Sequence, residues 1–138
     1  MKKVRIMDFF VLAFALLLGF GIVFFFGACG PKEDGSWMAC HWAERAVLVL
    51  GILCSLLALL KLFCANDGVK LGLSVAIFCI SLAAFFVPGR IFSLCKNIQM
   101  RCHLLMKPSV LVVTVLLCLF CLLDIIFLFR KVYPKVSR

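Results

Sequence analysis

The stretch VLVVTVLLCLFCLLDIIFLF (Val110–Phe129) has twenty residues and a single charged side chain, Asp124. A helix needs about 20 consecutive apolar residues to cross the hydrocarbon core of a bilayer. Three further apolar blocks precede this one along the chain: Phe9–Gly27, Ala46–Leu60 and Leu71–Val87. Each block, with its flanks, reaches the length of a membrane-spanning helix, and the sequence therefore predicts four spans.

The composition agrees with a membrane protein and disagrees with a soluble one. Hydrophobic residues make up 66% of the 138 positions and charged residues only 15%, too few to cover a soluble surface. We expect an all-α protein whose residues 1–138 form a single four-helix transmembrane domain. The predicted spans are about 7–27, 43–63, 70–87 and 108–129, with long outer loops at 28–42 and 88–107.

The basic residues predict the orientation. Nine of the fifteen Lys and Arg lie in the two tails and around the connection between the second and third spans. The other six lie in or next to the two long loops. The positive-inside rule then places both termini in the cytoplasm. Because the net charge of +9 comes from bases at span ends, it gives no indication of nucleic acid binding.

The first apolar block also resembles a lipoprotein signal, since a basic start and an apolar run lead to FGACG with Cys29. A run of about twenty apolar residues is long for the core of a signal peptide. We therefore expect a retained first helix, with lipidation of Cys29 as the alternative.

A short motif occurs twice. WMACHW (37–42) contains Met-x-Cys-His, and QMRCH (99–103) repeats it just before the fourth span. The matching positions relative to the spans predict an internal repeat. Two tandem helical hairpins would then be related by a pseudo-twofold axis along the membrane normal. Coincidence is the alternative to duplication.

Four of the nine cysteines fall in the predicted outer loops, namely Cys29, Cys40, Cys95 and Cys102. An oxidising extracytoplasmic face permits disulfides, and one bridge per loop (Cys29–Cys40 and Cys95–Cys102) is the simplest pairing. A bridge between loops, such as Cys40–Cys102, stays open. The other five cysteines lie in or at the ends of spans, where packing is the expected role.

Two chemical alternatives to structural disulfides involve the same loops. Cys40, His41, Cys102 and His103 are chemically suitable ligands for zinc or a haem-related group, although adjacent Cys-His pairs are not an established zinc spacing. Redox exchange is the other alternative, but neither loop contains Cys-x-x-Cys. The sequence thus predicts no resident cofactor and no catalytic residue. Trp37 and Trp42 are expected to anchor the chain at the membrane interface, with the histidines as polar caps.

Asp124 is the one acid inside the fourth span, and buried acids in membranes need a partner. Lys61 occupies a similar depth in the second span, so we predict a Lys61–Asp124 ion pair. A proton or ion path through Asp124 is the alternative, but the span centres offer almost no other polar groups.

The string MACHWAERAVLVLG (38–51), the CGP at 29–31 and the second-loop C…MRC resemble an uncharacterised prokaryotic four-span membrane family, domain of unknown function 4418. Where the family commonly shows Met-Pro-Cys and a Gly-Thr-Leu-Pro-like turn, this chain has QMRCHLLMKPSV. The resemblance implies location in a prokaryotic cytoplasmic membrane, and it implies genes near ATPase-driven transporters.

We therefore expect a small accessory or interaction subunit of a larger membrane complex, such as one containing an ABC-type transporter permease. The alternatives are an envelope thiol-disulfide oxidoreductase and a protein that binds a metal or haem-related ligand.

Overall fold

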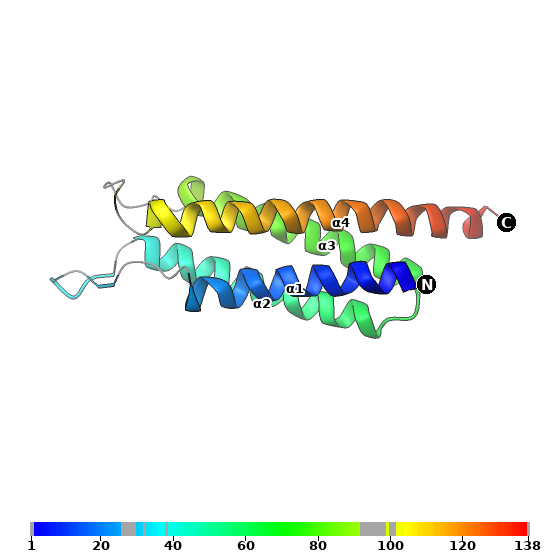
Figure 1. Ribbon diagram of the computed structural model, residues 1–138, viewed down its shortest axis with the longest axis horizontal. Coiled ribbons are helices and arrows are strands. Elements are labelled where there is room, and N and C mark those ends of the chain that lie inside the picture. Colours follow the sequence, from blue (N-terminus) through cyan, green and yellow to red (C-terminus); the bar gives the residue numbers. More distant parts are fainter. Residues whose placement is uncertain are drawn as a thin grey trace.

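The computed structural model describes residues 2–25, 30–31, 33–37, 39–91, 99 and 102–137. Within them the chain is all-α. Its long helices are α1 (Lys2–Phe24), α2 (Ala39–Phe63), α3 (Asp67–Phe86) and α4 (Lys107–Val136), shown in Figure 1. Two short π-type turns, η1 (Val87–Ile91) and η2 (Cys102–Met106), follow α3 and precede α4. All four long helices have the length and apolar composition needed to span a membrane, as the sequence predicts.

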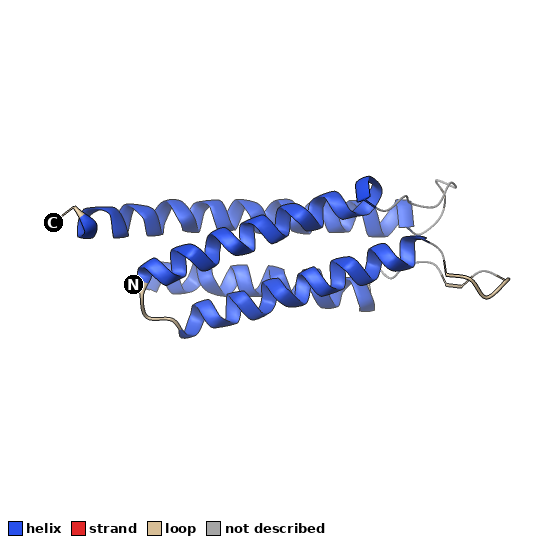
Figure 2. Cartoon of the chain, turned by 180° about the vertical axis from the view of Figure 1, so that it is seen from behind, coloured by secondary structure: helices blue, strands red, loops and turns tan. Residues whose placement is uncertain are grey.

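The four helices form an elongated bundle. Helix α1 packs mainly on α2, and α3 mainly on α4, while α2–α3 and α1–α4 contacts close the ring. Both chain termini lie at one end of the bundle, together with the short α2–α3 connection (Figures 1 and 2). We call this the termini end, and the opposite end, where α2 begins and α3 finishes, the loop end.

The helices differ in extent from the predicted spans: α1 begins at Lys2 rather than near residue 7, and α2 and α4 differ as well. Helix α2 begins at Ala39, although its apolar span was placed from residue 43, and α4 continues to Val136 beyond the predicted limit of 129. No Gly or Pro occurs in residues 39–43 or 130–133, so nothing local stops the helix where the apolar run stops. Hydropathy marks the apolar part of each helix, and the helix can continue beyond it, as α4 does through Pro134 to Val136.

Helix α3 ends where backbone chemistry requires it. Pro88 leaves the helical region (φ −76°, ψ 112°), and Gly89 adopts φ 89°, a left-handed conformation that glycine accepts without strain. The start of α3 is capped by Asn66, whose side chain accepts a hydrogen bond from Gly68 N at 3.0 Å.

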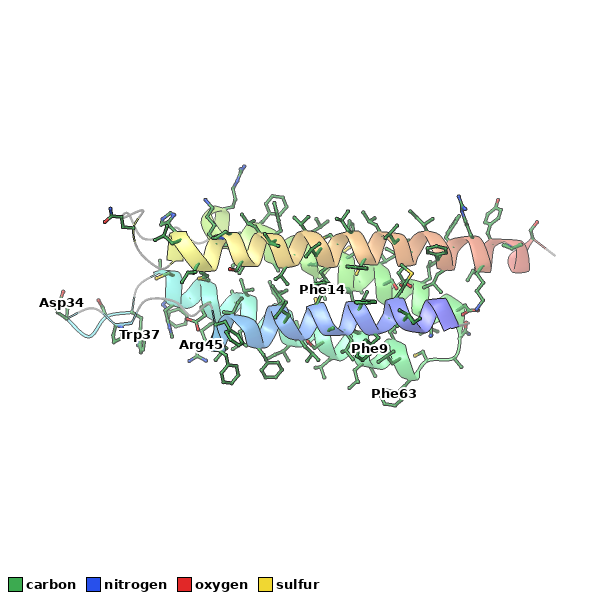
Figure 3. The ribbon with its side chains drawn as sticks, viewed as in Figure 1. Phe9, Phe14, Asp34, Trp37, Arg45 and Phe63 are labelled. Atoms are coloured by element: carbon green, nitrogen blue, oxygen red, sulfur yellow. The ribbon has the colours of Figure 1, made fainter. Side chains whose placement is uncertain are left out.

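The buried face of α2 carries mainly small side chains. Small or polar side chains recur every three or four residues on the inner face of α2, whereas large ones such as Phe9 and Phe63 point outward (Figure 3). The buried residues of α2 are Cys40, Ala43, Val47, Gly51, Cys54, Ala58 and Lys61. This arrangement is typical of membrane helices, since lipid solvates the large apolar side chains and small ones let helices approach closely.

The closest approach joins α1 and α2. A Cβ atom added to Gly51 would lie 2.6 Å from both the Cα and the backbone N of Gly19. No real Cβ tolerates backbone atoms at that distance, so Gly51 is required for the observed α1–α2 separation. Stacked rings of Phe14 and Phe120, with centroids 5.2 Å apart, hold α1 on its other side against α4.

Replacing Gly51 with Ala should lower the free energy of unfolding by about 1–3 kcal/mol, because two backbones must separate to admit one methyl group. The measurement is unfolding by SDS titration in mixed micelles, followed by helical circular dichroism. Gly72→Ala is the matched control, since nothing lies within 4 Å of its added Cβ. Equal stability of the Gly51→Ala and Gly72→Ala variants would show that the close approach is dispensable.

Candidate functional site

The most polar buried region of the bundle is a cluster to which all four helices contribute. Asp8 comes from α1, Lys61 from α2, Lys70 and Ser74 from α3, and Asp124 from α4. We call these five residues the charge network. It lies toward the termini end, since Asp8 follows the start of α1 closely and Lys61 precedes the end of α2.

Lys61 is at the centre of the charge network. Its Nζ donates to Asp124 Oδ2 and lies 2.8 Å from Asp8 Oδ1. One ammonium group therefore contacts carboxylates from two other helices.

Helix α3 contributes one side-chain contact to each of the two carboxylates of the charge network. Lys70 Nζ lies 3.1 Å from Asp8 Oδ2, and Ser74 Oγ lies 2.6 Å from Asp124 Oδ2. Because Lys70 and Ser74 are one helical turn apart, their side chains share a face of α3. The same hydroxyl lies 2.9 Å from the carbonyl oxygen of Lys70, so its proton has two acceptors within reach.

The charge network is sealed from the surroundings. The side chains of Asp8, Lys61 and Asp124 are at most 1% exposed, and that of Lys70 is 11% exposed. Two ammonium and two carboxylate groups sum to zero charge. Isolated charges would be very costly to bury here, and mutual pairing is what makes their burial tolerable.

Two carboxylate oxygens of the charge network have no hydrogen-bond partner among the described residues. Asp124 Oδ1 is buried without a hydrogen-bond partner among the described residues. Asp8 Oδ1 touches Lys61 Nζ as an ion pair, but this contact lacks hydrogen-bond geometry. Attraction between opposite charges therefore adds to the hydrogen bonds that Lys61, Lys70 and Ser74 make to the other carboxylate oxygens.

No comparable polar cluster extends through the centre of the described spans. The hydroxyl groups there return to their own helices: Ser55 donates to Gly51 O at 2.8 Å, and Thr114 donates to Val110 O at 2.7 Å. No Asp, Glu, Lys or Arg occurs in 9–24, 46–60, 71–86 or 110–123. The charge network thus lacks a polar continuation toward the loop end.

The structure brings together Lys61 and Asp124, the two residues that the sequence placed in an ion pair. Sequence reasoning missed Asp8 and treated Lys70 only as a base next to a turn. A signal was present, because Asp8 and Lys70 are 62 positions apart. His41 and His103 in the repeated motif have the same separation.

At the loop end, the first copy of the motif forms a ring stack. Trp37 stacks on His41 with centroids 4.1 Å apart and an interplanar angle of 24°, and Trp42 meets His41 edge-on at 6.2 Å. Both tryptophans are more than half exposed, whereas Cys40 is fully buried. The rings of His41 and Trp37 therefore cover the start of α2.

The second copy of the motif is described less fully. Cys29 and Cys95 lie outside the described residues, and the side chain of Cys102 does too. His103 lies half-buried in η2. The predicted disulfides and the Cys40–His41–Cys102–His103 ligand set thus stay predictions. Among the side chains that the structure describes, no group of three or more His, Cys, Asp or Glu could hold a metal ion.

The cysteines inside the bundle carry unbridged thiols: Cys54, Cys64, Cys79, Cys118 and Cys121. Cys54 and Cys121 are fully buried, and Cys118 Sγ lies 3.0 Å from Ser81 Oγ. Cys54 and Cys121 fill space between helices as small polarizable side chains, whereas Cys79 is exposed on the outer face of α3.

Comparison with known proteins places the chain in a family. The model of the family described as "Domain of unknown function (DUF4418)" matches residues 10–127, and the chain belongs to that family. No curated protein and no solved structure matches it.

Replacing Lys61 with Met should destabilise the bundle by about 3–5 kcal/mol, because it leaves a buried carboxylate without its ammonium partner. The double variant Lys61→Met/Asp124→Leu should recover much of that loss, since Asp8 and Lys70 then remain as a neutral pair. Unfolding in SDS measures both. Lys131→Met is the control, because the Lys131–Asp67 pair at 2.9 Å is partly exposed and worth at most about 1 kcal/mol.

A charge reversal gives a second test of the charge network. Lys61→Asp/Asp124→Lys should not restore stability, because the new Asp would face Asp8, whose Oδ1 lies 2.8 Å from the present Lys61 Nζ. Full rescue by this swap would mean that Lys61 interacts with Asp124 alone.

Proposed function

We propose that this DUF4418 protein is an interaction subunit of a larger membrane complex, and that an ABC-type transporter permease is its partner. The observation that carries the proposal is the neutral charge network. The intramembrane charges bond to one another, and no polar route leads from them across the described spans. Such a bundle has the features of a structural element, which binds through its lipid-facing helices and its loops.

The exposed surface supports a docking role. Bulky apolar side chains cover the outside of the helices, and they include Phe20 at 55% exposure and Leu56 at 54%. In a bilayer these faces are available to lipid or to the helices of a neighbouring protein. The permease itself is an expectation from the family resemblance.

We further propose that the chain consists of two hairpins related by a pseudo-twofold axis. The 62-residue separation of Asp8 and Lys70 supports this, and Lys61 and Asp124 are 63 apart. At an offset of 62 residues Asp8 corresponds to Lys70, and Lys61 corresponds to the position just before Asp124. Corresponding places in the two hairpins then carry opposite charges, which pair between the hairpins. Both termini are placed in the cytoplasm of a prokaryotic cell, by the distribution of basic residues and by the resemblance.

Affinity capture tests the interaction role. Full-length protein with a C-terminal tag, extracted from native membranes in a mild detergent, should retain a permease subunit in a fixed molar ratio. A tagged four-span protein of another family, extracted in parallel, is the control. Purification of the chain as an isolated species, with no protein in fixed ratio, would contradict the proposal.

The outer loops are proposed to be pinned by disulfides, Cys29–Cys40 and Cys95–Cys102. Mass spectrometry of unreduced, alkylated protein should find both bridged peptides. Loss of either bridge should cost roughly 2–3 kcal/mol for rings of this length. Four alkylated thiols in protein from native membranes would rule the bridges out. Bridges that exchange with substrate thiols would instead support the oxidoreductase alternative.

A further inference from the structure

A groove at the loop end of the bundle runs between α2 and the end of α3. Its floor is formed by Ala46 from α2, Ala83 from α3 and Val87 from η1, and Val49 from α2 lies at its edge. Trp42 and Arg45 flank its mouth. We call this the loop-end groove.

The helical register explains why the surface is hollow there. Ala46 and Val49 are three positions apart on α2. Val87 follows Ala83 by four positions where α3 passes into η1, and Val87 still has helical dihedral angles, so each pair lies on one face. An alanine from each helix leaves a channel where larger side chains would meet. Val49 at its edge is 56% exposed, so the channel opens to the surroundings of the bundle.

The mouth of the loop-end groove is positively charged. Arg45 is exposed and points away from the bundle, near the end that carries Trp37 (Figure 3). No carboxylate among the described residues forms an ion pair with Arg45, and the same holds for exposed Arg90 in η1. The lipid-facing start of α2 thus presents an unneutralised guanidinium above an apolar channel.

We propose that the loop-end groove binds a phospholipid with an anionic headgroup. Arg45 donates paired hydrogen bonds to the phosphate, a geometry that guanidinium fits better than ammonium. An acyl chain lies along Ala46 and Ala83. Trp42 is 59% exposed and stands where interfacial tryptophans meet headgroups.

Charge complementarity identifies the ligand. Arg45 needs an anion at the depth where the apolar channel begins, and a phospholipid carries its phosphate directly above its acyl chains. A partner helix would have to supply a carboxylate at the same depth. The site is independent of the proposed interaction function, since it requires no other protein.

Native mass spectrometry of the full chain in detergent tests the site. Titration with phosphatidylglycerol should give one tightly bound lipid, and phosphatidylcholine should bind more weakly. Arg45→Gln should weaken phosphatidylglycerol binding about tenfold, the effect of losing a charge-assisted hydrogen bond. Arg130→Gln, an exposed arginine on α4 at the termini end, is the matched control and should bind like the wild type.

A second variant tests the channel separately from the charge. Ala83→Leu fills the floor and should weaken binding of both lipids, whereas Ala13→Leu on an exposed position of α1 should not. Inorganic phosphate at millimolar concentration should not displace the lipid.

Three results would overturn the site: equal affinity for the two lipids, equal losses in Arg45→Gln and Arg130→Gln, or displacement by phosphate alone. The Ala83→Leu and Arg45→Gln variants leave the charge network intact, so loss of lipid binding can be distinguished from unfolding by an unchanged SDS midpoint.

Discussion

A single ammonium group, that of Lys61, contacts carboxylates from two other helices, and the rest of the bundle has to satisfy that arrangement. Asp8 and Asp124 can both reach it only if α1, which lies beside α2, and α4, which lies across the bundle from α2, carry their carboxylates at the same depth. Lys70 then closes the cluster from α3. A helix that slid by one residue would rotate its charge by about 100° and leave it facing lipid or apolar side chains. The charge network therefore fixes depth and rotation for all four helices.

Close packing fixes the separation of α1 and α2, which the charges alone do not fix. Coulombic attraction falls slowly with distance, so by itself it tolerates loose helices. The contact of Gly51 with Gly19 is short-ranged and fails with one extra methyl group. The contact of Gly51 with Gly19 lies at the middle of α2, and the charge network lies toward the termini end. Helices α1 and α2 are therefore held together at two levels along the bundle. The charge network sets the rotation and depth of the helices, and the contact of Gly51 with Gly19 sets the separation of α1 and α2.

The sequence predicts the four spans and half of the charge network. The four spans follow from hydropathy, because lipid imposes a length and composition that few soluble sequences match. Asp124 stands out since it is the one acid in its span, and the depth of Lys61 suggests a partner. Asp8 and Lys70 were missed because each lies near a span end, where charged residues normally face headgroups. Whether such a side chain turns inward depends on helix rotation, which a membrane helix with apolar residues on every side does not reveal.

The arrangement of charges also bears on how the chain enters the membrane. A ribosome delivers α1 and α2 before α3 and α4, and these first two helices carry one acid and one base of the charge network, Asp8 and Lys61, which lie 2.8 Å apart in the finished bundle. Helices α3 and α4 likewise contribute one acid and one base to the charge network, Asp124 and Lys70. Within the charge network each half of the chain therefore contributes no net charge. The contacts of Lys61 with Asp124 and of Lys70 with Asp8 then join the two halves without leaving either with a buried charge of one sign.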